Sequence, residues 1–214
     1  MAVNSLVFLL VAVFLSIHGS LANTCGPTIT DTYDDIALTS GFAEPLTYNG
    51  LIYSHGWSVH AGNPWQNGPS FAHSPPNVID GSAWSGDPRI ANNPNLTIAI
   101  AAGYFELKGL YFGCLNSNGA VPCSVGISGF DVNGAQVPVY IYRYEEPHSS
   151  TSLIFAAPRE GPAIKFVTAI IRVVSSADAP WTTSLLVDSL VHVNCVGGPQ
   201  ITATVTTLYP VASG

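Results

Sequence analysis

The sequence has few charged side chains and lacks the signatures of several common protein classes. Only 9% of its 214 residues are charged, and 13 acidic residues outnumber 6 lysines and arginines, which gives a net charge of −7. Because there is no basic patch, we expect neither nucleic acid nor an anionic membrane as a partner. Phosphate-binding glycine loops and the GxSxG motif of serine hydrolases are also missing. The sequence therefore contains no positive indication of an enzyme.

Sustained helical patterns are missing as well. No stretch combines a helical period of apolar residues with capping residues at its ends. Apolar, β-branched runs instead alternate with turn residues, and we expect strands over residues 29–38, 51–59, 96–101, 104–112, 124–132, 136–144, 152–156, 165–174 and 185–195. Asn133-Gly134 between two such runs is a strong hairpin signal. We predict one all-β domain over residues 23–200, an antiparallel β-sandwich of about nine strands with a jelly-roll plan.

The two ends of the chain differ from this domain. Residues 1–22 contain an uncharged apolar run that is followed by small residues, which predicts a secretory signal peptide. The alternative is a membrane anchor, but the run is too short to span a bilayer comfortably and no stop-transfer charges follow it. Residues 201–214 form a small polar tail without the hydrophobic end of a lipid-anchor signal. We expect a secreted, extracellular monomer.

Secretion makes two kinds of covalent modification expected. The four cysteines indicate two disulfides. Of the three possible pairings we favour Cys114–Cys123, which closes a short turn-rich loop, together with Cys25–Cys195, which joins the terminal strands. Zinc is the alternative, but no CxxC or HxxxH spacing accompanies these cysteines. Asn95 begins an Asn-Leu-Thr acceptor for N-glycosylation, and a glycan there implies that Asn95 lies at an exposed strand entry.

A carboxylate interrupts an apolar run near the C-terminus, where Asp188 lies within LLVDSLVHVNC. An ionised carboxylate in an apolar strand is costly unless it is paired, hydrogen-bonded or bound to a metal. Asp34 and Asp35 have a similar setting near the N-terminus, so we expect the terminal strands to be neighbours. These carboxylates have the right chemistry for calcium. The alternatives are acceptors of backbone hydrogen bonds and a glycosidase-like catalytic pair, which burial between terminal strands would keep from substrate.

Several short motifs carry a resemblance to known proteins. They are the acidic pair Asp34-Asp35, YNGLIYS at 48–54, SPPNVI at 74–79, FELKGLYFG at 105–113 and VDSL at 187–190. In this order they resemble small secreted β-sandwich proteins of filamentous fungi. Their plan is similar to that of calcium-containing carbohydrate-binding modules with a galactose-binding-like jelly roll. The resemblance implies this fold and a structural Ca²⁺ held by Asp34, Asp35 and Asp188, although such modules often use glutamates at these positions.

Aromatic side chains gather in and near a long segment rich in glycine and proline, residues 60–94. Flat aromatic rings suit the CH face of a pyranose ring, and long loops in compact domains are often functional. The candidate ligand-binding residues are Trp57, Trp65, Trp84, His73, Tyr140, Tyr142 and Tyr144. The alternatives are a satellite core for the tryptophans and cross-strand packing for the tyrosines. The spacing of His55, His60 and His73 matches no recognised metal-ligand pattern.

Three classes of function follow from these features. We favour a secreted, non-catalytic binding module for glycan or cell-wall material, so that the expected partner is a polysaccharide or a cell-surface glycan. A jelly-roll polysaccharide hydrolase or lyase, with acids such as Glu106, Glu145 or Glu146, is the second class. A host-interaction or structural protein without a small ligand is the third. An exposed aromatic strip favours the first class, and two carboxylates in an open groove favour the second.

Overall fold

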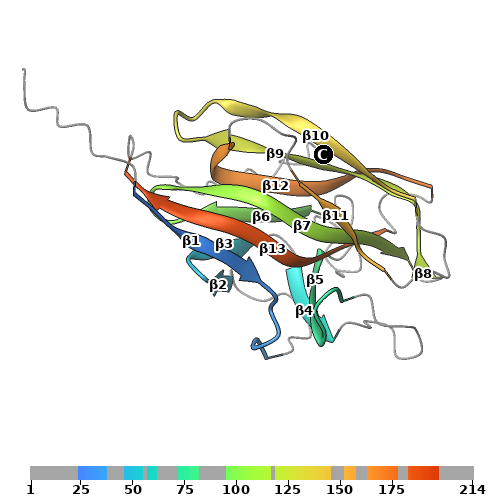
Figure 1. Ribbon diagram of the computed structural model, residues 1–214. Helices are drawn as coiled ribbons and strands as arrows, with labels where there is room; N and C mark the ends of the chain where they lie inside the picture. Colours follow the sequence, from blue (N-terminus) through green and yellow to red (C-terminus); the bar gives the residue numbers. More distant parts are fainter. Residues whose placement is uncertain are drawn as a thin grey trace, which may run out of the picture.

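The computed structural model describes residues 24–37, 46–54, 57–61, 72–81, 95–116, 119–145, 152–157, 163–177 and 183–197. These residues form an antiparallel β fold without a helix, which confirms the all-β sandwich prediction (Figure 1). Within these ranges no helix is long and apolar enough to cross a membrane. The strands are β1 Thr24–Asp31, β2 Leu46–Tyr48, β3 Leu51–Ser54, β4 Trp57–Ala61, β5 Asn77–Gly81, β6 Asn95–Ile100, β7 Tyr104–Asn116, β8 Gly119–Ala120, β9 Cys123–Asp131, β10 Gln136–Tyr144, β11 Ile154–Ala156, β12 Lys165–Ser176 and β13 Ser184–Val196.

The strands follow two runs that share one core. The first run is β2-β3-β6-β12-β9-β10, and the second is β11-β7-β13 with β1 and β5-β4 beyond β13. The runs are joined where β12 pairs with β7, at Lys165–Glu106 and Phe166–Phe105. Large side chains from both runs, including Phe112 and Ile98, are fully buried in one hydrophobic cluster. Alternation of apolar and polar residues along the strands places these side chains inward.

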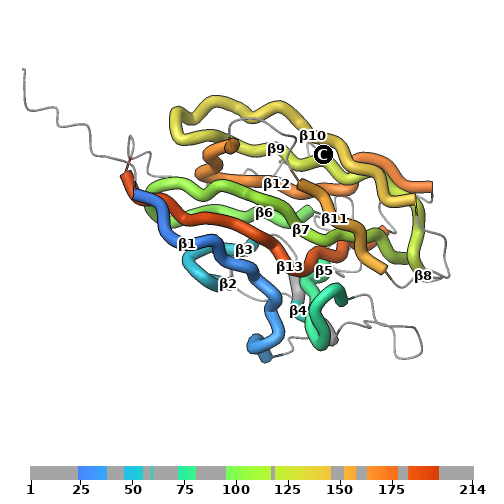
Figure 2. The backbone as a smooth tube through the Cα atoms, viewed as in Figure 1, coloured from blue at the N-terminus to red at the C-terminus, as the bar shows by residue number. Residues whose placement is uncertain are grey.

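Strand β13 organises the second run because it changes partner along its length. On one side it pairs with β7. On the other side it pairs first with β5 and then with β1, which places the terminal strands side by side (Figure 2). The change falls at Asp188–Ser189, where the β13–β7 register shifts and Ser189 has a φ of 47°. The expected neighbourhood of the terminal strands is therefore correct.

The first strand begins and ends earlier than the sequence suggests. We expected it over residues 29–38, but β1 covers Thr24–Asp31. Tyr33 then adopts a φ of 62°, and the Ile36 N–H donates to the Tyr33 carbonyl at 3.1 Å, which closes a turn. Asp34 lies in this turn, not on a strand. The pattern of apolar residues did not reveal the turn because Tyr33 is itself fully buried.

Part of the segment expected to be irregular is a strand. Residues 77–81 of the 60–94 segment form β5, which pairs with both β4 and β13. Val78 and Ile79 are fully buried, so this short run supplies core side chains to the second run of strands. The strand count rises above the expected nine mainly because of such short strands, and β8 has only 2 residues.

A buried polar network connects β1, β13 and the turn before β3. Asp31 accepts hydrogen bonds from the Tyr53 hydroxyl and from Asn49 Nδ2 (2.7 Å), and its Oδ2 lies 3.2 Å from His192 Nε2. His192 Nδ1 is 2.9 Å from Asn194 Oδ1, and Asn194 Nδ2 donates to the Asn49 carbonyl at 2.9 Å. Asp31 and His192 are fully buried. The network thus provides hydrogen-bond partners for the Asp31 carboxylate and for His192 Nδ1, whereas His192 Nε2 lies beside Asp31 without a hydrogen bond to any described residue.

Both expected disulfides are present. Cys25–Cys195 joins β1 to β13, and Cys114–Cys123 links β7 to the start of β9. The first closes a sequence separation of 170 residues and the second only 9. In the chain-entropy model a cross-link stabilises more as the closed loop lengthens, because it restricts the unfolded chain more.

This difference predicts unequal losses of stability. The double variant Cys25→Ala/Cys195→Ala should lose about 5 kcal/mol of unfolding free energy, and Cys114→Ala/Cys123→Ala about 3 kcal/mol. Urea denaturation followed by tryptophan fluorescence measures both. Equal losses, or a larger loss from the short loop, would contradict the loop-length argument.

Candidate functional site

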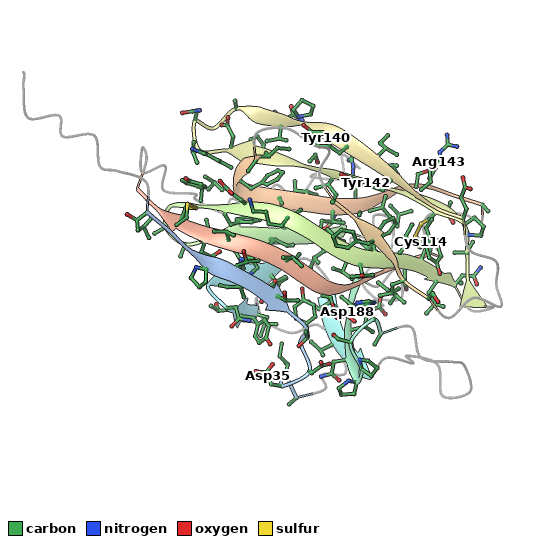
Figure 3. The ribbon with its side chains drawn as sticks, in the orientation of Figure 1. Asp35, Cys114, Tyr140, Tyr142, Arg143 and Asp188 are labelled. Carbon is green, nitrogen blue, oxygen red and sulfur yellow. A yellow bond between two sulfur atoms is a disulfide. The ribbon has the colours of Figure 1, made fainter. Side chains whose placement is uncertain are left out.

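Asp188 lies where β13 changes partner, and its carboxylate fastens a neighbouring segment. Ser74 donates from its backbone N–H to Asp188 Oδ2 at 2.8 Å and from its hydroxyl to Oδ1 at 3.2 Å. The Ser189 N–H donates to Oδ1 at 2.5 Å. Burial raises the pKa of Asp188, and the hydrogen bonds from Ser74 and Ser189 oppose that shift. Asp188 therefore holds the chain at Ser74 against β13, and Figure 3 labels its position.

The residue before Ser74 contributes to an exposed row of rings. The His73 ring stacks on the Tyr111 ring, with centroids 3.4 Å apart and planes at 10°. Phe155 lies on the other side, with its centroid 5.1 Å from that of Tyr111. Tyr111 is the ladder partner of both Asp188 and Phe155, which aligns the three rings across β11, β7 and the segment before β5. We call His73, Tyr111 and Phe155 the aromatic strip.

The two outer rings of the strip are exposed to solvent, and the central ring packs against the core. His73 is exposed, Phe155 is 51% exposed, and Tyr111 is half-buried against the core. A Cβ added to Gly109 would lie 2.3 Å from Phe155 Cζ. The absence of a side chain at Gly109 thus leaves room for the end of the Phe155 ring over β7. The strands and one buried carboxylate therefore present two exposed rings, His73 and Phe155, and exposed aromatic rings can stack on a flat ligand.

Of the predicted ligand-binding residues, His73 belongs to this strip. Trp65 and Trp84 lie outside the described residues, as does the side chain of Trp57. Neither Tyr111 nor Phe155 was a candidate. Tyr111 lies outward between the buried Leu110 and Phe112, whereas strict alternation from the exposed Lys108 would place it inward. The register shift between the Leu107 and Gly109 pairs with β13 reverses the phase, and no local pattern reveals it. Phe155 lies in a three-residue strand, where no period can be recognised.

The three β10 tyrosines face the core more than the solvent. Tyr140 and Tyr142 are half-buried against the hydrophobic cluster, and Tyr144 is fully buried. Tyr142 donates its hydroxyl to the Ala157 carbonyl at 2.8 Å, and Tyr144 donates to the Ser152 carbonyl at 3.0 Å. The opposite face carries the exposed side chains of Val139 (42%) and Ile141 (60%). Tyr144 accordingly belongs to the core. Tyr140 and Tyr142, with Val139 and Ile141, line a shallow cavity of about 320 Å³.

The two acidic residues near the N-terminus also accept hydrogen bonds. Asp34 Oδ1 accepts the backbone N–H of Asn77 at 3.1 Å, and Asp35 Oδ1 accepts the Tyr48 hydroxyl at 2.6 Å. Figure 3 shows Asp35 well separated from Asp188. N–H groups directed at the Asp188 oxygens occupy positions that a bound cation would need. The donor set therefore fits a hydrogen-bonded arrangement better than a calcium cage, and calcium stays a prediction.

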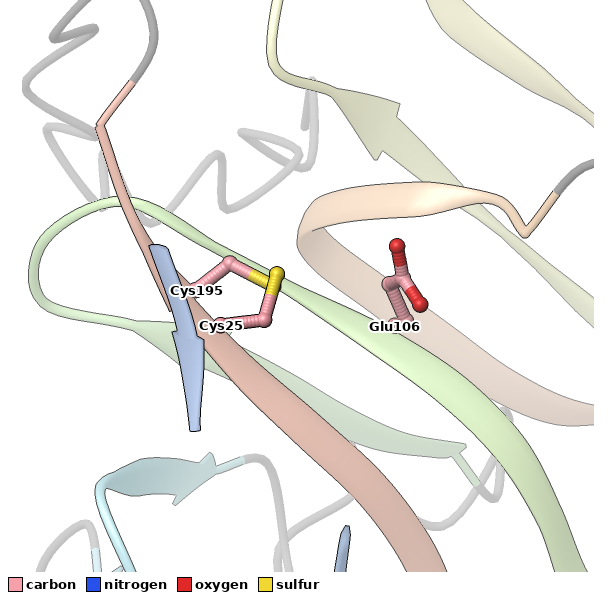
Figure 4. A group of neighbouring side chains, drawn as sticks. All are labelled: Cys25, Glu106 and Cys195. Carbon is pink, nitrogen blue, oxygen red and sulfur yellow. A yellow bond between two sulfur atoms is a disulfide. The ribbon is translucent and has the colours of Figure 1, made fainter. Parts of the chain in front are cut away.

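One other group of metal-ligand side chains converges among the described residues. Ligand atoms of Cys25, Glu106 and Cys195 lie within 4.8 Å of one another (Figure 4). The two sulfurs are bonded to each other, so neither is available as a thiolate ligand. Glu106 Oε2 is also paired with Lys108 Nζ at 2.7 Å. This group is a disulfide beside an ion pair.

Comparison with known proteins gives no family. No protein-family model matches the chain, and no curated protein matches it. Among solved structures, a DUF4465 family protein from Bacteroides caccae is similar over 79% of this chain and 100% of its own, with 12% identity and a TM-score of 0.42. The CBM22-1 xylan-binding domain of Xyn10C from Paenibacillus barcinonensis is similar over 82% of this chain and 98% of its own, with 12% identity and a TM-score of 0.38.

Because Asp188 holds Ser74 by hydrogen bonds, two variants should differ in the position of the His73 ring. In Asp188→Asn an amide NH₂ must face one of the backbone N–H donors, so the hold on Ser74 weakens and the His73 ring leaves Tyr111. Ser74→Ala keeps the backbone bond and should leave the stacking intact. NMR chemical shifts of the His73 ring protons report the Tyr111 ring current. Unchanged His73 shifts in Asp188→Asn would contradict this role.

A second buried carboxyl lies on β5, next to the same part of β13. Asp80 is the ladder partner of Leu186 on β13 and of Ser58 on β4. Burial raises the pKa of Asp80 from 3.8 to about 7, and the neighbouring Ser184 side chain opposes this shift. The folded chain thus holds a proton on Asp80 that the unfolded chain releases at lower pH.

This shift predicts how stability depends on pH. A group whose pKa is higher in the folded state contributes stability below its unfolded value, and that contribution is lost as pH rises. The Asp80 contribution should be complete below about pH 4 and fall as pH rises through about 7, by an amount on the order of 4 kcal/mol. Urea titrations from pH 4 to 8 measure it. Asp80→Asn should flatten the profile, and the exposed control Glu145→Gln should not. A wild-type profile that Asp80→Asn leaves unchanged would refute the assignment.

Proposed function

We propose that this chain is a secreted, non-catalytic carbohydrate-binding module that binds a neutral polysaccharide through the aromatic strip. The observation that carries the proposal is the row formed by His73, Tyr111 and Phe155, whose outer members are exposed. Two disulfides are typical of extracellular proteins and support secretion.

The chemistry of the strip suits a sugar ring. An aromatic ring offers an apolar face with a polar edge, which matches the CH face of a pyranose. His73 and Phe155 lie on opposite sides of Tyr111, so a ligand that contacts both must extend across β7. An extended chain of sugar units meets this requirement better than one monosaccharide. The chain's excess of acidic residues disfavours anionic polysaccharides, because like charges repel at short range.

The described carboxylates give less support to a hydrolase or lyase. Asp31, Asp80 and Asp188 are buried, and Glu106 is paired with Lys108. Glu145 is exposed, with Arg143 at 4.0 Å. A glycosidase needs two carboxyl groups on either side of a bound sugar, and no such pair flanks the aromatic strip among the described residues. The third class, a host-interaction or structural protein without a small ligand, gives no reason for the exposed rings of the aromatic strip.

The proposal predicts which substitutions weaken binding. His73→Ala and Phe155→Ala should each reduce affinity for a bound neutral polysaccharide about tenfold, because loss of one stacked ring removes roughly 1 to 1.5 kcal/mol. Melting temperatures should change little, since both side chains are exposed. Affinity electrophoresis against soluble xylans, glucans, mannans and galactans identifies a ligand, and isothermal titration calorimetry then measures the affinities.

Phe130 provides a matched control, because it is 47% exposed on β9 and lies outside the strip. Phe130→Ala should bind like the wild type. If Phe155→Ala and His73→Ala retain wild-type affinity, or if Phe130→Ala loses as much, the strip is not the site. A wild-type protein that binds none of these polysaccharides would refute the proposed function.

A further inference from the structure

The predicted glycosylation acceptor begins a row of residues that crosses four strands. Asn95 on β6 pairs with Arg172 on β12, Arg172 pairs with Gly126 on β9, and Gly126 pairs with Ile141 on β10. Directly opposed residues of neighbouring strands share one face of a sheet. Their chain neighbours Leu96 and Ile171 are fully buried, so this row lies on the outer face. Asn95 is half-exposed at the first position of β6, and its buried Oδ1 has no hydrogen-bond partner among the described residues.

The same face carries an apolar surface. Its members alternate with core residues along β9, β10 and β12, and are Phe130, Val139, Ile141, Ile170 and Val174; we call them the outer apolar face. Three of them are between 42% and 60% exposed, and the two on β12 are half-buried. Exposed apolar residues that are contiguous, unlike scattered ones, usually mark a covered or interacting surface.

Gly126 makes this surface continuous between β12 and β10. A Cβ at this position would lie 2.9 Å from Val174 Cγ1 and 3.0 Å from Val139 Cγ1. Both valines therefore close over the glycine from opposite sides. The row from Asn95 thus leads past Arg172 directly onto apolar side chains, with Ile141 at its far end.

We propose that Asn95 carries an N-linked glycan and that this glycan lies over the outer apolar face. Strands in a sheet are about 4.8 Å apart, so Asn95 and Ile141 are roughly 14 Å apart across three strand spacings. The branched core of an N-linked glycan spans this distance. Its CH groups would cover Val139 and Ile141, and its hydroxyls would face water. The face is separate from the aromatic strip, and the proposal depends on secretion but not on the proposed ligand binding.

The acceptor sequence supplies the matched variants for a test. The protein is produced by a eukaryotic secreting host as wild type, Thr97→Ser, which keeps the acceptor, and Thr97→Ala, which removes it without altering Asn95. Intact-mass spectrometry should find a glycan on the first two only. Fluorescence of the dye 8-anilinonaphthalene-1-sulfonate should then be several-fold higher for Thr97→Ala. Enzymatic removal of the glycan from folded wild type should raise it equally, which provides a test even if Thr97→Ala folds poorly.

A further substitution locates the uncovered surface. Ile141→Ser in deglycosylated protein should return the fluorescence toward that of the glycosylated wild type. Self-association on deglycosylation that Ile141→Ser abolishes would support the same conclusion, and sedimentation velocity detects it. An unglycosylated wild type would overturn the proposal. So would a glycan whose removal leaves dye fluorescence unchanged, or dye binding that Ile141→Ser does not affect.

Discussion

The change of partner along β13 is the constraint on which the other features depend. One edge of β13 serves both β5 and β1, so its ladder must break between them, and buried polar groups at a break need new partners. The Asp188 carboxylate supplies them, because it accepts hydrogen bonds from the Ser74 and Ser189 N–H groups. The break therefore fixes the segment that carries His73, and it allows β1 to close the fold against β13.

Burial of polar groups determines how the terminal strand is held. Asp31, the last residue of β1, lies inside the protein close to His192, whereas the Cys25–Cys195 disulfide joins β13 to the opposite end of β1. Because β1 is exposed except at Ile29 and Asp31, apolar burial alone would allow it to shift by two residues along β13. A hydrogen-bonded carboxylate does not allow this shift, because the displaced Asp31 would be buried without partners. We infer that the network and the disulfide together specify the register.

The sequence predicted local features well and features that depend on distant contacts poorly. Asn133-Gly134 and the cysteines gave a correct hairpin and correct disulfides, because these signals are contained in a few residues. Period two along β10 defines two faces without identifying which one the core covers, and a register shift between Val137 and Tyr140 separates the buried Val137 from the exposed Val139. Tyr142 lies inward because its ring packs against Phe112 and its hydroxyl donates to the Ala157 carbonyl. The Tyr111–Phe155 contact depends on pairing between β7 and β11, which no local pattern encodes.

Low surface charge is relevant to both the aromatic strip and the outer apolar face. With 9% charged residues, the protein has little electrostatic repulsion to prevent association through exposed apolar side chains. The described residues nevertheless include the aromatic strip and the outer apolar face, which both expose apolar side chains. Carbohydrate offers both CH groups and hydroxyls, so it can cover an apolar surface and still present hydroxyls to water. This combination of CH groups and hydroxyls suits both proposed roles of carbohydrate. One is a ligand on β7 and β11, and the other is a covalent glycan over β9, β10 and β12. Under both proposals the low charge leaves these surfaces better suited to sugar than to ions.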